Sequence, residues 1–433
     1  MRILIDFIYL LTAAAISPVV VYRMVRHKRY RSGWAQRFGR ITRKDISKKC
    51  IWIHAVSVGE VNATKTIVKE LNNRFGDFEV VLSTTTDTGF ARASELFGQS
   101  LQVFYFPLDF SWTMRRAFRN IRPALCLLME LEVWPNFVQI AQQLNIPVVV
   151  ANGRISDRSF SKYKKIRPVA KKIFQKVNLI LAQTDEYAQR FKEIGCHSER
   201  IVVAGSLKYD TAQIVDKVQG AYAVAVQLGI DDERLWVAGA TGNDEEKILL
   251  DAFGKLKQQK RFGDLRLVIV PRKPERFDEV AQLITDAGFD FVRYSSIKNA
   301  DAPKPDKVPV ILGDTMGDLR KFYSLATIIF VGRSLVPMGG SDMAEAAALG
   351  KCTIFGPHAF NFKQTVDALL AGDGAIMVKD GQELFDTTQK CLAEPDFART
   401  IAQNGREVIR KNQGATVKTI DQIAKFLNAT EKR

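Results

Sequence analysis

The sequence predicts an α/β protein made of two Rossmann-like domains, each a parallel sheet covered by helices on both faces. From Cys50 onward, short and continuously apolar runs alternate with amphipathic segments, which is the pattern of parallel strands joined by helices. This alternation stops in the segment 210–234, which carries no strand pattern, and then begins again. The length of 433 residues also exceeds what one hydrophobic core usually serves. We therefore expect two domains and a connection between them.

Both domains contain a series of strand candidates. In the first domain these are CIWIHAV, FEVVLSTT, QVFYFPL, ALCLLME, PVVVANG, LILAQT and IVVAGS. In the second domain they are LWVAGAT, LRLVIVP, FVRYSS, VPVILGD, TIIFVGR, CTIFGP and AIMVK, with three helices expected after Asp380. The expected organisation is a membrane anchor at 1–22, a basic segment at 23–49, a first domain at 50–209, a linker at 210–234 and a second domain at 235–433.

The segment 3–22 is mostly apolar, and its length is close to the roughly 20 residues that a helix needs to cross a bilayer. Asp6 and Pro18 lie toward its two ends, where a bilayer tolerates them better. A cleavable signal peptide is the main alternative, but the basic run that follows resists translocation. We expect an uncleaved, single-pass anchor with the rest of the chain in the cytoplasm. A helix lying in the membrane interface is the weaker option, because Asp6, Thr12 and Ser17 are too few for a polar face.

The formal net charge of +16 is concentrated in two stretches. Nine Arg and Lys residues and no acidic residue lie between Arg23 and Lys44, and nine with a single Asp lie between Arg154 and Lys176. Such stretches indicate an anionic partner. Aromatic residues within the first stretch are compatible with nucleic-acid binding. Beside an anchor, however, attraction to an anionic membrane surface, about 1 kcal/mol per charge, is the simpler interpretation, so we expect no nucleic acid.

Cysteine and histidine usage favours neither a disulfide framework nor a metal site. The five cysteines are widely spaced and odd in number, which is typical of single buried thiols in a reducing compartment. The four histidines do not show metal-ligand spacing. We expect no metal and no cofactor.

Glu60 stands in the peptide HAVSVGEV, where a buried strand gives way to a helix. Gly59 permits a tight turn, and a carboxylate in the first turn of a helix is stabilised by roughly 0.3–1 kcal/mol. A glutamate at this position is also a common structural cap. By itself this peptide favours neither a catalytic nor a structural interpretation.

A second pair of carboxylates favours the catalytic interpretation. In LLMELEVWPN, Glu130 and Glu132 end an apolar strand, and Pro135 suits the first turn of the helix that follows. Acidic residues at the end of a buried strand are costly unless they are paired or face a cleft. Ligands of open α/β sheets bind at the carboxyl ends of strands, so Glu60 and this pair are expected to share one site. Desolvation and like charges there would raise a glutamate pKa toward that of a general base.

The second domain carries anion-binding features after its strands. Arg272, Lys273 and Arg276 form a cationic cluster suited to phosphate. The segment LGDTMGDLRKFY offers backbone donors where a helix opens at Asp318, and a glycine-rich loop leads into a helix that carries Glu345. Together these features predict that the second domain binds a nucleotide monophosphate or diphosphate while the first supplies a base.

Taken together, HAVSVGEV, STTTDTG, MELEVWPN, ANGRIS, GSLKYD, VPRKPERF, LGDTMGDL, VGRSLVPMGG and FGPHAFNF resemble the Kdo (3-deoxy-D-manno-oct-2-ulosonic acid) transferases of lipopolysaccharide assembly. The resemblance covers essentially the whole chain. It implies a GT-B glycosyltransferase fold and metal-independent, inverting transfer of Kdo from CMP-Kdo to the lipid A precursor at the cytoplasmic face of the inner membrane.

The resemblance also implies site residues. Glu60 is expected to be the base that deprotonates the acceptor hydroxyl, and Glu130 the supporting acid. The implied contacts to CMP or CMP-Kdo are Pro271, Arg272, Met316, Gly317, Asp318, Gly339, Gly340, Asp342, Met343, Ala344 and Glu345, with Glu345 on the ribose.

Three segments differ from the family pattern. The chain has Ser341, Asp342 and Met343 where the family usually reads His-Asn-Pro, and Lys273 where His is usual; the segment GATGNDEE also lacks an expected His. An acidic Asp342 should weaken anion binding unless it caps the helix. A GT-B enzyme that uses a UDP- or GDP-sugar is the alternative function, and a basic membrane-tethered nucleic-acid binder is the non-enzymatic one.

Overall fold

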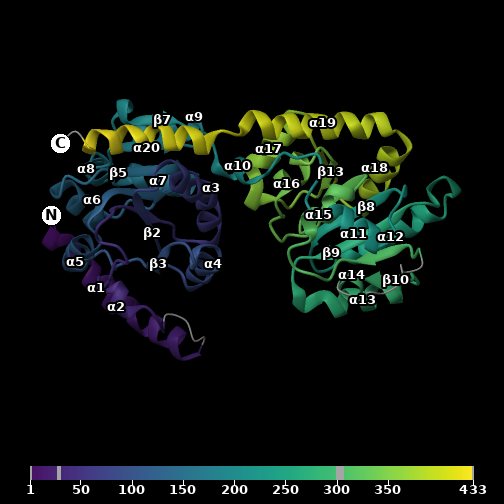
Figure 1. The fold of residues 1–433 in the computed structure, drawn as a ribbon, viewed down its shortest axis with the longest axis horizontal. Coiled ribbons are helices and arrows are strands. Elements are labelled where there is room, and N and C mark those ends of the chain that lie inside the picture. Colours follow the sequence, from purple (N-terminus) through teal and green to yellow (C-terminus); the bar gives the residue numbers. More distant parts are fainter. Residues whose placement is uncertain (1, 27–30, 299–306, 432–433) are drawn as a thin grey trace. The chain divides into compact units, whose positions relative to one another are not determined.

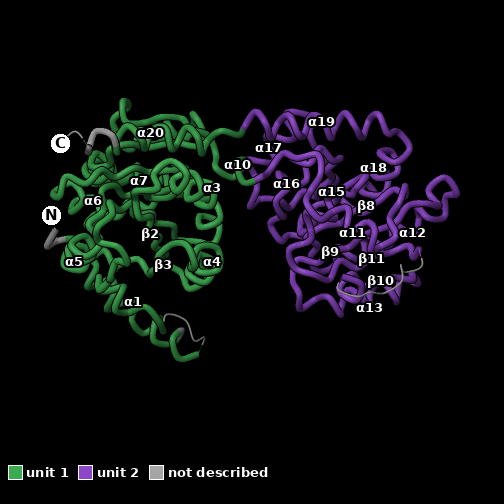
Figure 2. Tube along the Cα trace, in the orientation of Figure 1, with its two compact units in different colours: residues 1–211, 413–433 green, residues 212–412 purple. Residues whose placement is uncertain are grey.

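The computed structural model describes residues 2–26, 31–298 and 307–431. Its chain packs into two units, Met1–Thr211 with Gln413–Arg433 (unit 1) and Ala212–Asn412 (unit 2), coloured separately in Figure 2. Each unit contains a seven-stranded sheet with parallel strands, and helices flank the strands as Figure 1 shows. The expected α/β class, with two Rossmann-like domains, is confirmed.

The sheet of unit 1 has the strand order β3-β2-β1-β4-β5-β6-β7, so the order reverses between β1 and β4. Every apolar run expected to form a strand in this half does so. The strands are β1 Lys49–His54, β2 Phe78–Thr84, β3 Gln102–Tyr105, β4 Pro123–Met129, β5 Val148–Gly153, β6 Leu179–Ala182 and β7 Ile201–Val203. The helices are α1 Arg2–Arg26, α2 Trp34–Arg37, α3 Val58–Arg74, α4 Asp87–Phe97, α5 Ser111–Ile121, α6 Pro135–Gln143, α7 Asp157–Lys165, α8 Arg167–Phe174, α9 Asp185–Glu193, α10 Leu207–Thr211 and α20 Ala415–Glu431.

Strand β1 shows how the apolar runs build this core. Cys50 and Trp52 belong to the cluster on one side of the sheet, and Ile51 and Ile53 to the cluster on the other. Successive side chains of a strand point to opposite faces, so a continuous apolar run is buried on both. The ring of Trp52 packs edge-on against Phe137 of α6, with the ring centroids 5.0 Å apart.

The last helix, α20, packs on unit 1, although it follows unit 2 in the sequence. Its residues Ile420, Ile423 and Leu427 are buried in the cluster that contains α3. Arg74 of α3 and Asp421 form an ion pair of 2.7 Å beside them. The sequence predicted a helix here but placed it in the second domain, because an amphipathic pattern shows that one face is buried and not which sheet buries it.

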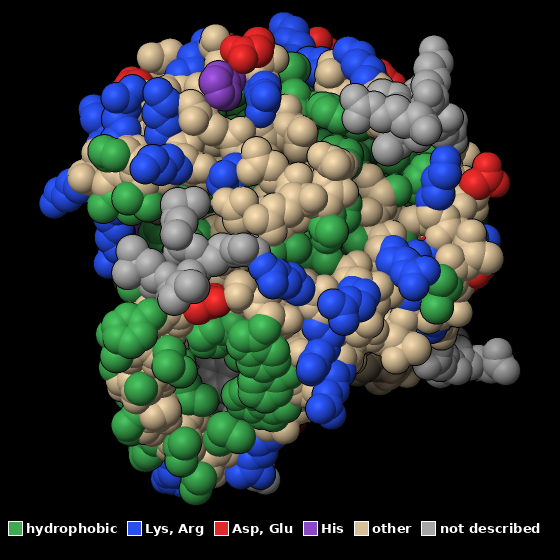
Figure 3. Space-filling view, turned by 90° about the vertical axis from the view of Figure 1, so that its left-hand side faces the viewer, with side chains coloured by type: hydrophobic (Ala, Val, Ile, Leu, Met, Phe, Trp, Pro, Cys, Tyr) green, Lys and Arg blue, Asp and Glu red, His purple; other side chains and the backbone are tan. Residues whose placement is uncertain are grey.

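The N-terminal helix α1 is attached to unit 1 but is exposed along most of its length. It is long and apolar enough to cross a membrane by length and composition, and no second such helix was found among the described residues. In Figure 3, hydrophobic side chains gather at the lower left of the face shown, with Lys and Arg side chains beside them. The chain returns to the body of the unit at α2, where buried Arg37 donates a 3.2 Å hydrogen bond to the Thr85 carbonyl.

The sheet of unit 2 has the order β10-β11-β9-β8-β12-β13-β14, with its reversal between β8 and β12. All strands expected in this half are present. They are β8 Leu235–Thr241, β9 Arg266–Pro271, β10 Phe291–Arg293, β11 Val310–Leu312, β12 Ile328–Val331, β13 Cys352–Phe355 and β14 Ile376–Met377. The helices are α11 Ala221–Gln227, α12 Glu245–Lys257, α13 Phe277–Asp286, α14 Tyr294–Ile297, α15 Leu319–Leu325, α16 Met343–Ala348, α17 Lys363–Ala371, α18 Gly381–Ala393 and α19 Pro395–Asn412.

Most of the segment expected as a connection is packed into unit 2. Helix α11 buries Ala221, Val224 and Ala225, and the Val218 N–H donates a 3.3 Å hydrogen bond to the Ser324 hydroxyl. The segment has no strand pattern because it forms a helix, which packs against α15.

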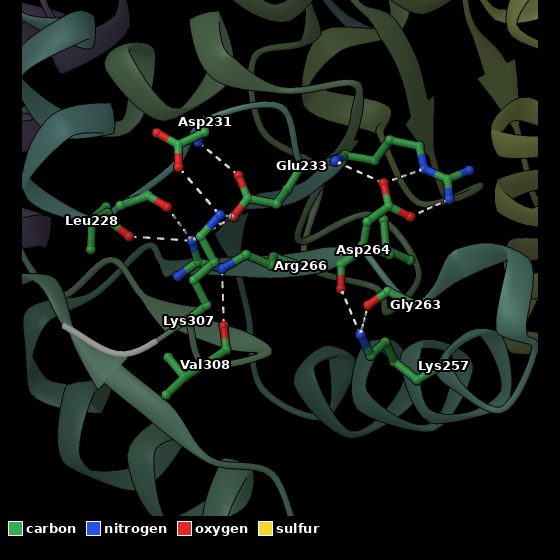
Figure 4. Close-up of polar contacts among 12 residues, drawn as sticks. Leu228, Asp231, Glu233, Lys257, Gly263, Asp264, Arg266, Lys307 and Val308 are labelled. Atoms are coloured by element: carbon green, nitrogen blue, oxygen red, sulfur yellow. Dashed lines mark hydrogen bonds and ion pairs between the residues drawn. The ribbon is translucent and has the colours of Figure 1, made fainter. Parts of the chain in front are cut away.

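A polar network supports the edge of unit 2 where β9 begins (Figure 4). The buried guanidinium of Arg266 donates hydrogen bonds to the carbonyls of Val308 (2.9 Å), Leu228 (3.2 Å) and Gly229 (3.4 Å). Glu233 lies 4.0 Å from Arg266 and 2.8 Å from Lys307. These contacts join the start of β9 to two loops, at the opposite end of the strand from Pro271.

Candidate functional site

In unit 1, Glu60 lies where β1 leads into α3, beside the reversal of strand order. Ser57 caps α3, and its hydroxyl donates to Glu60 Oε1 (2.9 Å), while the Val56 N–H donates to Oε2 (2.9 Å). Glu60 therefore has the geometry of a capping glutamate, which was its structural interpretation. It is also 8% exposed, and each carboxylate oxygen has a further lone pair that can accept a hydroxyl proton.

Two more glutamates follow β4, the other strand at the reversal. Glu130 adopts a left-handed backbone with φ of 53° and donates its N–H to the Ala151 carbonyl at 2.9 Å. This conformation is unusual for a residue with a side chain, and such outliers are often found at functional sites. Glu132 Oε2 accepts a 3.0 Å hydrogen bond from the indole Nε1 of Trp134. The tight turn brings both carboxyls toward Glu60.

The three carboxyls interact electrostatically. Burial raises the pKa of Glu60, and the charge of Glu130 raises it further, against the lowering effect of the capping hydrogen bonds. Burial, then the charge of Glu60, raises the pKa of Glu132 to about 7, with a smaller contribution from Glu130. With this pKa, Glu132 gains and loses a proton near neutral pH. The structure thus brings together Glu60, Glu130 and Glu132, a set that can accept and return a proton.

Sequence analysis placed Glu132 in this site as the partner of Glu130 but gave it no role of its own. Its spacing of two from Glu130 was visible in MELE, but its burial was not. His54, at the end of β1, is by contrast a core residue. It is fully buried and stacked on Phe106 with ring centroids 3.7 Å apart, and burial lowers its pKa to about 3. It is neutral at physiological pH.

Unit 2 has a cationic pocket at its own reversal of strand order. A cavity of about 140 Å³ lies between the loops that follow β8, β9 and β12. The loop after β8 contributes backbone and side chains, and the loops after β9 and β12 contribute arginine and lysine side chains. The cavity is lined by Thr241, Gly242, Asn243, Arg272, Lys273, Arg276, Arg333 and Met338. The pocket has the size and charge to receive a phosphate group.

The cations of this pocket are not equivalent. The Arg276 guanidinium is held by Glu246 through two hydrogen bonds of 2.6 and 3.1 Å, and Glu279 accepts two more. Arg276 was expected to bind phosphate, but it is committed to these carboxylates. Arg272 and Lys273 are exposed at the rim. Arg333, which sequence analysis missed, enters from the loop after β12, where its backbone φ is 60°.

Buried Glu245 holds the pocket loops together. Its carboxylate accepts hydrogen bonds from the backbone N–H groups of Gly242 (2.9 Å), Ser334 (2.7 Å), Leu335 (2.9 Å) and Arg333. Burial raises the pKa of Glu245, whereas these four donors lower it. A carboxylate so enclosed fixes the loop after β8 against the loop after β12. Sequence analysis overlooked it because a glutamate in a first helical turn is ordinary.

The glycine-rich loop is joined to the same pocket. Gly340 donates its N–H to the Arg333 carbonyl at 2.7 Å, and the Arg333 side chain donates to the Met338 carbonyl at 3.1 Å. Gly339 has φ of 90°, and a Cβ there would lie 2.1 Å from the Asn361 side chain. Only glycine fits that position.

Asp342 caps the helix α16 that follows this loop. Its side chain accepts a 3.0 Å hydrogen bond from the Ala344 N–H, so this donor is already engaged. The side chains of Met343 and Ala344 are buried, which leaves their backbone as the part that can meet a ligand. Burial raises the pKa of Tyr323, and Glu345 and Asp342 contribute, so both acidic residues lie near this ring.

The segment 316–318 forms a loop before α15. The Met316 side chain is exposed, and a Cβ added to Gly317 would meet nothing within 4 Å. Asp318 is buried and bound to Lys298 (2.6 Å) and Lys321 (2.7 Å). Burial alone would raise the pKa of Asp318, but these ammonium groups and Thr315 hold it at about 2. The carboxylate is thus a support for the loop.

No cluster of three or more His, Cys, Asp or Glu residues with the arrangement of a metal site occurs within residues 2–26, 31–298 and 307–431. The five cysteines are free and buried.

Comparison with known proteins agrees with this architecture. A family model described as "3-Deoxy-D-manno-octulosonic-acid transferase (kdotransferase)" matches residues 32–211. A 3-deoxy-D-manno-octulosonic acid transferase of Haemophilus influenzae is 33% identical over 408 residues, covering 93% of each chain. The enzyme of the same name from Bordetella pertussis is 31% identical over 433 residues, covering 97% of this chain and 99% of the relative.

Among solved structures, a glycosyltransferase from Rickettsia africae covers 89% of this chain and 100% of its own, with a TM-score of 0.56. Its sequence identity of 14% makes this a likeness of fold alone.

Proposed function

The chain belongs to the family of 3-deoxy-D-manno-octulosonic acid transferases, and on that premise we propose that it transfers Kdo from CMP-Kdo to the lipid A precursor, lipid IVA, with Glu60 as the general base. As a family member it is a glycosyltransferase of lipopolysaccharide biosynthesis. The observation that carries the proposal is the cluster of three carboxyls at the strand reversal of unit 1, of which Glu60 is buried and Glu130 and Glu132 are partly buried.

In this proposal, unit 1 supplies the base. Glu60 accepts the proton of the acceptor hydroxyl while that oxygen forms a bond to the anomeric carbon of Kdo. The bond from this carbon to the CMP phosphate breaks with inversion, and CMP leaves with the electron pair. The raised pKa of Glu60 brings its basicity closer to working pH, which favours proton transfer. Glu130 stabilises the charge that develops, and Glu132 holds a proton near pH 7 within the same cluster.

Unit 2 binds the nucleotide in this proposal. Arg272, Lys273 and Arg333 line a pocket of suitable size for the phosphate and would stabilise the charge on departing CMP. The remaining expected contacts come from the loops at 316–318 and 339–345. There Gly317, Gly339 and Gly340 expose backbone, and Glu345 is expected to hold the ribose.

We place the protein at the cytoplasmic face of the inner membrane, where the lipid acceptor lies. Helix α1 is the support for attachment, together with the basic surfaces that would face anionic lipid.

One assay tests the activity directly. The protein is incubated with lipid IVA and CMP-Kdo generated in situ, and the lipid product is analysed by mass spectrometry. A mass increase equal to one or more Kdo residues is expected. An unmodified lipid would contradict the proposal.

Nucleotide binding tests the alternative donor. We expect CMP and CTP to raise the thermal unfolding temperature, because a ligand that binds only the native state stabilises it. UDP and GDP should leave it unchanged. Stabilisation by UDP or GDP alone would favour a different glycosyltransferase activity.

A further inference from the structure

The N-terminal end of α1 is bound to the body of unit 1. The Asp6 carboxylate accepts hydrogen bonds from the Ser111 N–H (2.9 Å), the Ser111 hydroxyl (2.5 Å) and the Asn136 side-chain amide (2.9 Å). One turn further on, the Tyr9 hydroxyl donates a 3.0 Å hydrogen bond to Asp109. Asp6 and Tyr9, two polar side chains of this end, are both used for docking.

Buried Asp109 links this docking point to the fold. Its carboxylate also accepts the backbone N–H groups of Asn136 (3.0 Å) and Phe137 (2.8 Å), which begin α6. Burial raises the pKa of Asp109 to about 7, even though these hydrogen bonds lower it. The ring of Tyr9 meets Phe110 edge-on with centroids 6.0 Å apart. The contact therefore joins α1 to the starts of α5 and α6.

The C-terminal end of α1 is held close to the same unit. Arg31 donates hydrogen bonds to the carbonyls of Met24 (2.7 Å) and Val25 (3.3 Å), near the end of the helix. The next residue, Ser32, lies within a 3.2 Å hydrogen bond of the Tyr105 hydroxyl at the end of β3. Arg31 thus binds the end of α1 through its side chain, and the residue that follows it contacts the sheet.

The spacing of these contacts is incompatible with a helix that crosses the bilayer. From Asp6 to Met24 the helix rises about 27 Å at 1.5 Å per residue, close to the thickness of the hydrocarbon core. A crossing helix would hold its two ends on opposite sides of the membrane. Their anchor points, Tyr105 and Ser111, are six residues apart in one folded unit, hence at most about 20 Å. Unit 1 cannot lie on both sides.

Between its ends, α1 is suited to hydrocarbon. The hydroxyls of exposed Thr12 and Ser17 donate to carbonyls of the helix itself. The other exposed side chains are mostly apolar, which a solvated helix does not tolerate. They include Phe7, Ile8, Leu10, Leu11, Ile16, Val19 and Val21. Pro18 cannot donate to the Ala14 carbonyl, but the Ser17 hydroxyl does so at 2.9 Å. Such internal pairing is what a backbone in lipid requires.

We propose that α1 lies parallel to the membrane, embedded in the leaflet that faces unit 1, and does not cross the bilayer. The proposal rests on the proposed membrane attachment and not on the transfer reaction. It replaces the single-pass anchor expected from the sequence. The exposed apolar surface of α1 contacts the acyl chains of that one leaflet.

The surroundings of α1 fit the headgroup level of the same leaflet. Trp112, at the start of α5, is 49% exposed, stacks on Phe38 with centroids 5.8 Å apart, and lies beside Arg116. An exposed tryptophan next to arginine is typical of a membrane interface. Ile166, between α7 and α8, and Val169 of α8 are exposed and lie among exposed lysines and arginines.

This orientation brings lipid close to the carboxyl cluster. Asn136, which binds Asp6, follows Glu132 by four residues, and Tyr163 of α7 interacts electrostatically with both Tyr9 and Glu132. If the proposed function holds, a glycolipid acceptor reaches the carboxyls from the leaflet in which α1 lies.

The orientation is tested with an epitope tag before residue 1 and a second tag after residue 433 of the full chain. Protease is added to spheroplasts, which expose the outer face, and to inverted membrane vesicles, which expose the cytoplasmic face. We expect both tags to be cleaved in vesicles and to resist in spheroplasts. Cleavage of the N-terminal tag in spheroplasts, with the C-terminal tag intact, would overturn the proposal.

A matched variant tests the docking contacts. Asp6→Leu with Tyr9→Phe removes the hydrogen bonds and makes the helix end apolar. We expect a majority of N-terminal tags in this variant to become cleavable in spheroplasts. An unchanged pattern would overturn the assignment of Asp6 and Tyr9 as the contacts that hold the helix. Because the measurement is independent of transferase activity, it distinguishes a wrong orientation from a wrong function.

Discussion

Replacing Glu132 by glutamine should stabilise the protein at high pH and do nothing at low pH. The folded state binds a proton on Glu132 with a pKa of about 7, above the ordinary value of 4.5. Between these values the native protein holds more protons than the unfolded chain, so this group makes the free energy of unfolding fall as pH rises from 4.5 to 7. Below pH 4.5 both states are protonated, and the penalty disappears.

The size of the effect follows from the same shift. At 1.36 kcal/mol per pKa unit, a displacement from 4.5 to about 7 corresponds to about 3 kcal/mol. Glutamine is neutral and nearly isosteric, and its carbonyl can still accept the hydrogen bond from Trp134. Glu132→Gln should therefore raise the free energy of unfolding by up to about 3 kcal/mol at pH 8, and by nearly nothing at pH 4.5.

Guanidinium unfolding of the full-length protein in detergent at these two pH values provides the measurement. Only the transition that reports on unit 1 should shift. Glu95→Gln, which alters an exposed glutamate of α4 paired with Arg92, is the matched control and should change stability by less than about 0.5 kcal/mol. A Glu132→Gln variant that is less stable than wild type at pH 8 would refute the reasoning, because the carboxylate would then be a favourable charge.

Three further outcomes are expected. Glu60→Gln, which can retain both capping hydrogen bonds, should lower kcat at least about 100-fold. CMP binding, measured by calorimetry, should not change, and near-normal turnover would remove Glu60 from the mechanism. Arg272→Ala should weaken CMP binding about tenfold by loss of a charged phosphate contact, whereas Lys255→Ala, at an exposed position of α12, should not; equal affinities would exclude this pocket. Arg266→Ala should cost about 3 kcal/mol in guanidinium unfolding, because it leaves three carbonyls without their donor. Exposed Arg261→Ala should cost under about 0.5 kcal/mol; equal losses would mean that the network is not structural.

The strands were predictable because each is buried on both faces. A run such as Cys50 to His54 must be apolar at every position, and the sheet around it then follows from the helices between the runs. The membership of α20 was not predictable. Ile420, Ile423 and Leu427 show an apolar stripe, but the partner that covers it lies more than 300 residues away, on α3.

The site was predictable in part, because ligands of open α/β sheets bind at the carboxyl ends of strands. Glu60 and Glu130 were found in this way, and the structure places them at the one reversal of strand order in unit 1. The proton held by Glu132 was not predictable, since it depends on burial and on the left-handed turn at Glu130. Arg276 was wrongly expected to bind phosphate, because its actual partner, the carboxylate of Glu246, is 30 residues away in the sequence.

The same limit explains why the sequence indicates a crossing helix. Length and apolar composition show that a helix is suited to lipid, but they do not show whether it crosses the bilayer or lies along one leaflet. Asp6 decides between them, because a carboxylate bound to Ser111 and Asn136 keeps the helix end beside the folded domain. Breaking those bonds without a replacement would leave a charge in hydrocarbon at a cost of at least about 2.5 kcal/mol. The orientation of α1 therefore depends on hydrogen bonds to residues more than 100 positions away, and a hydropathy pattern contains no information about them.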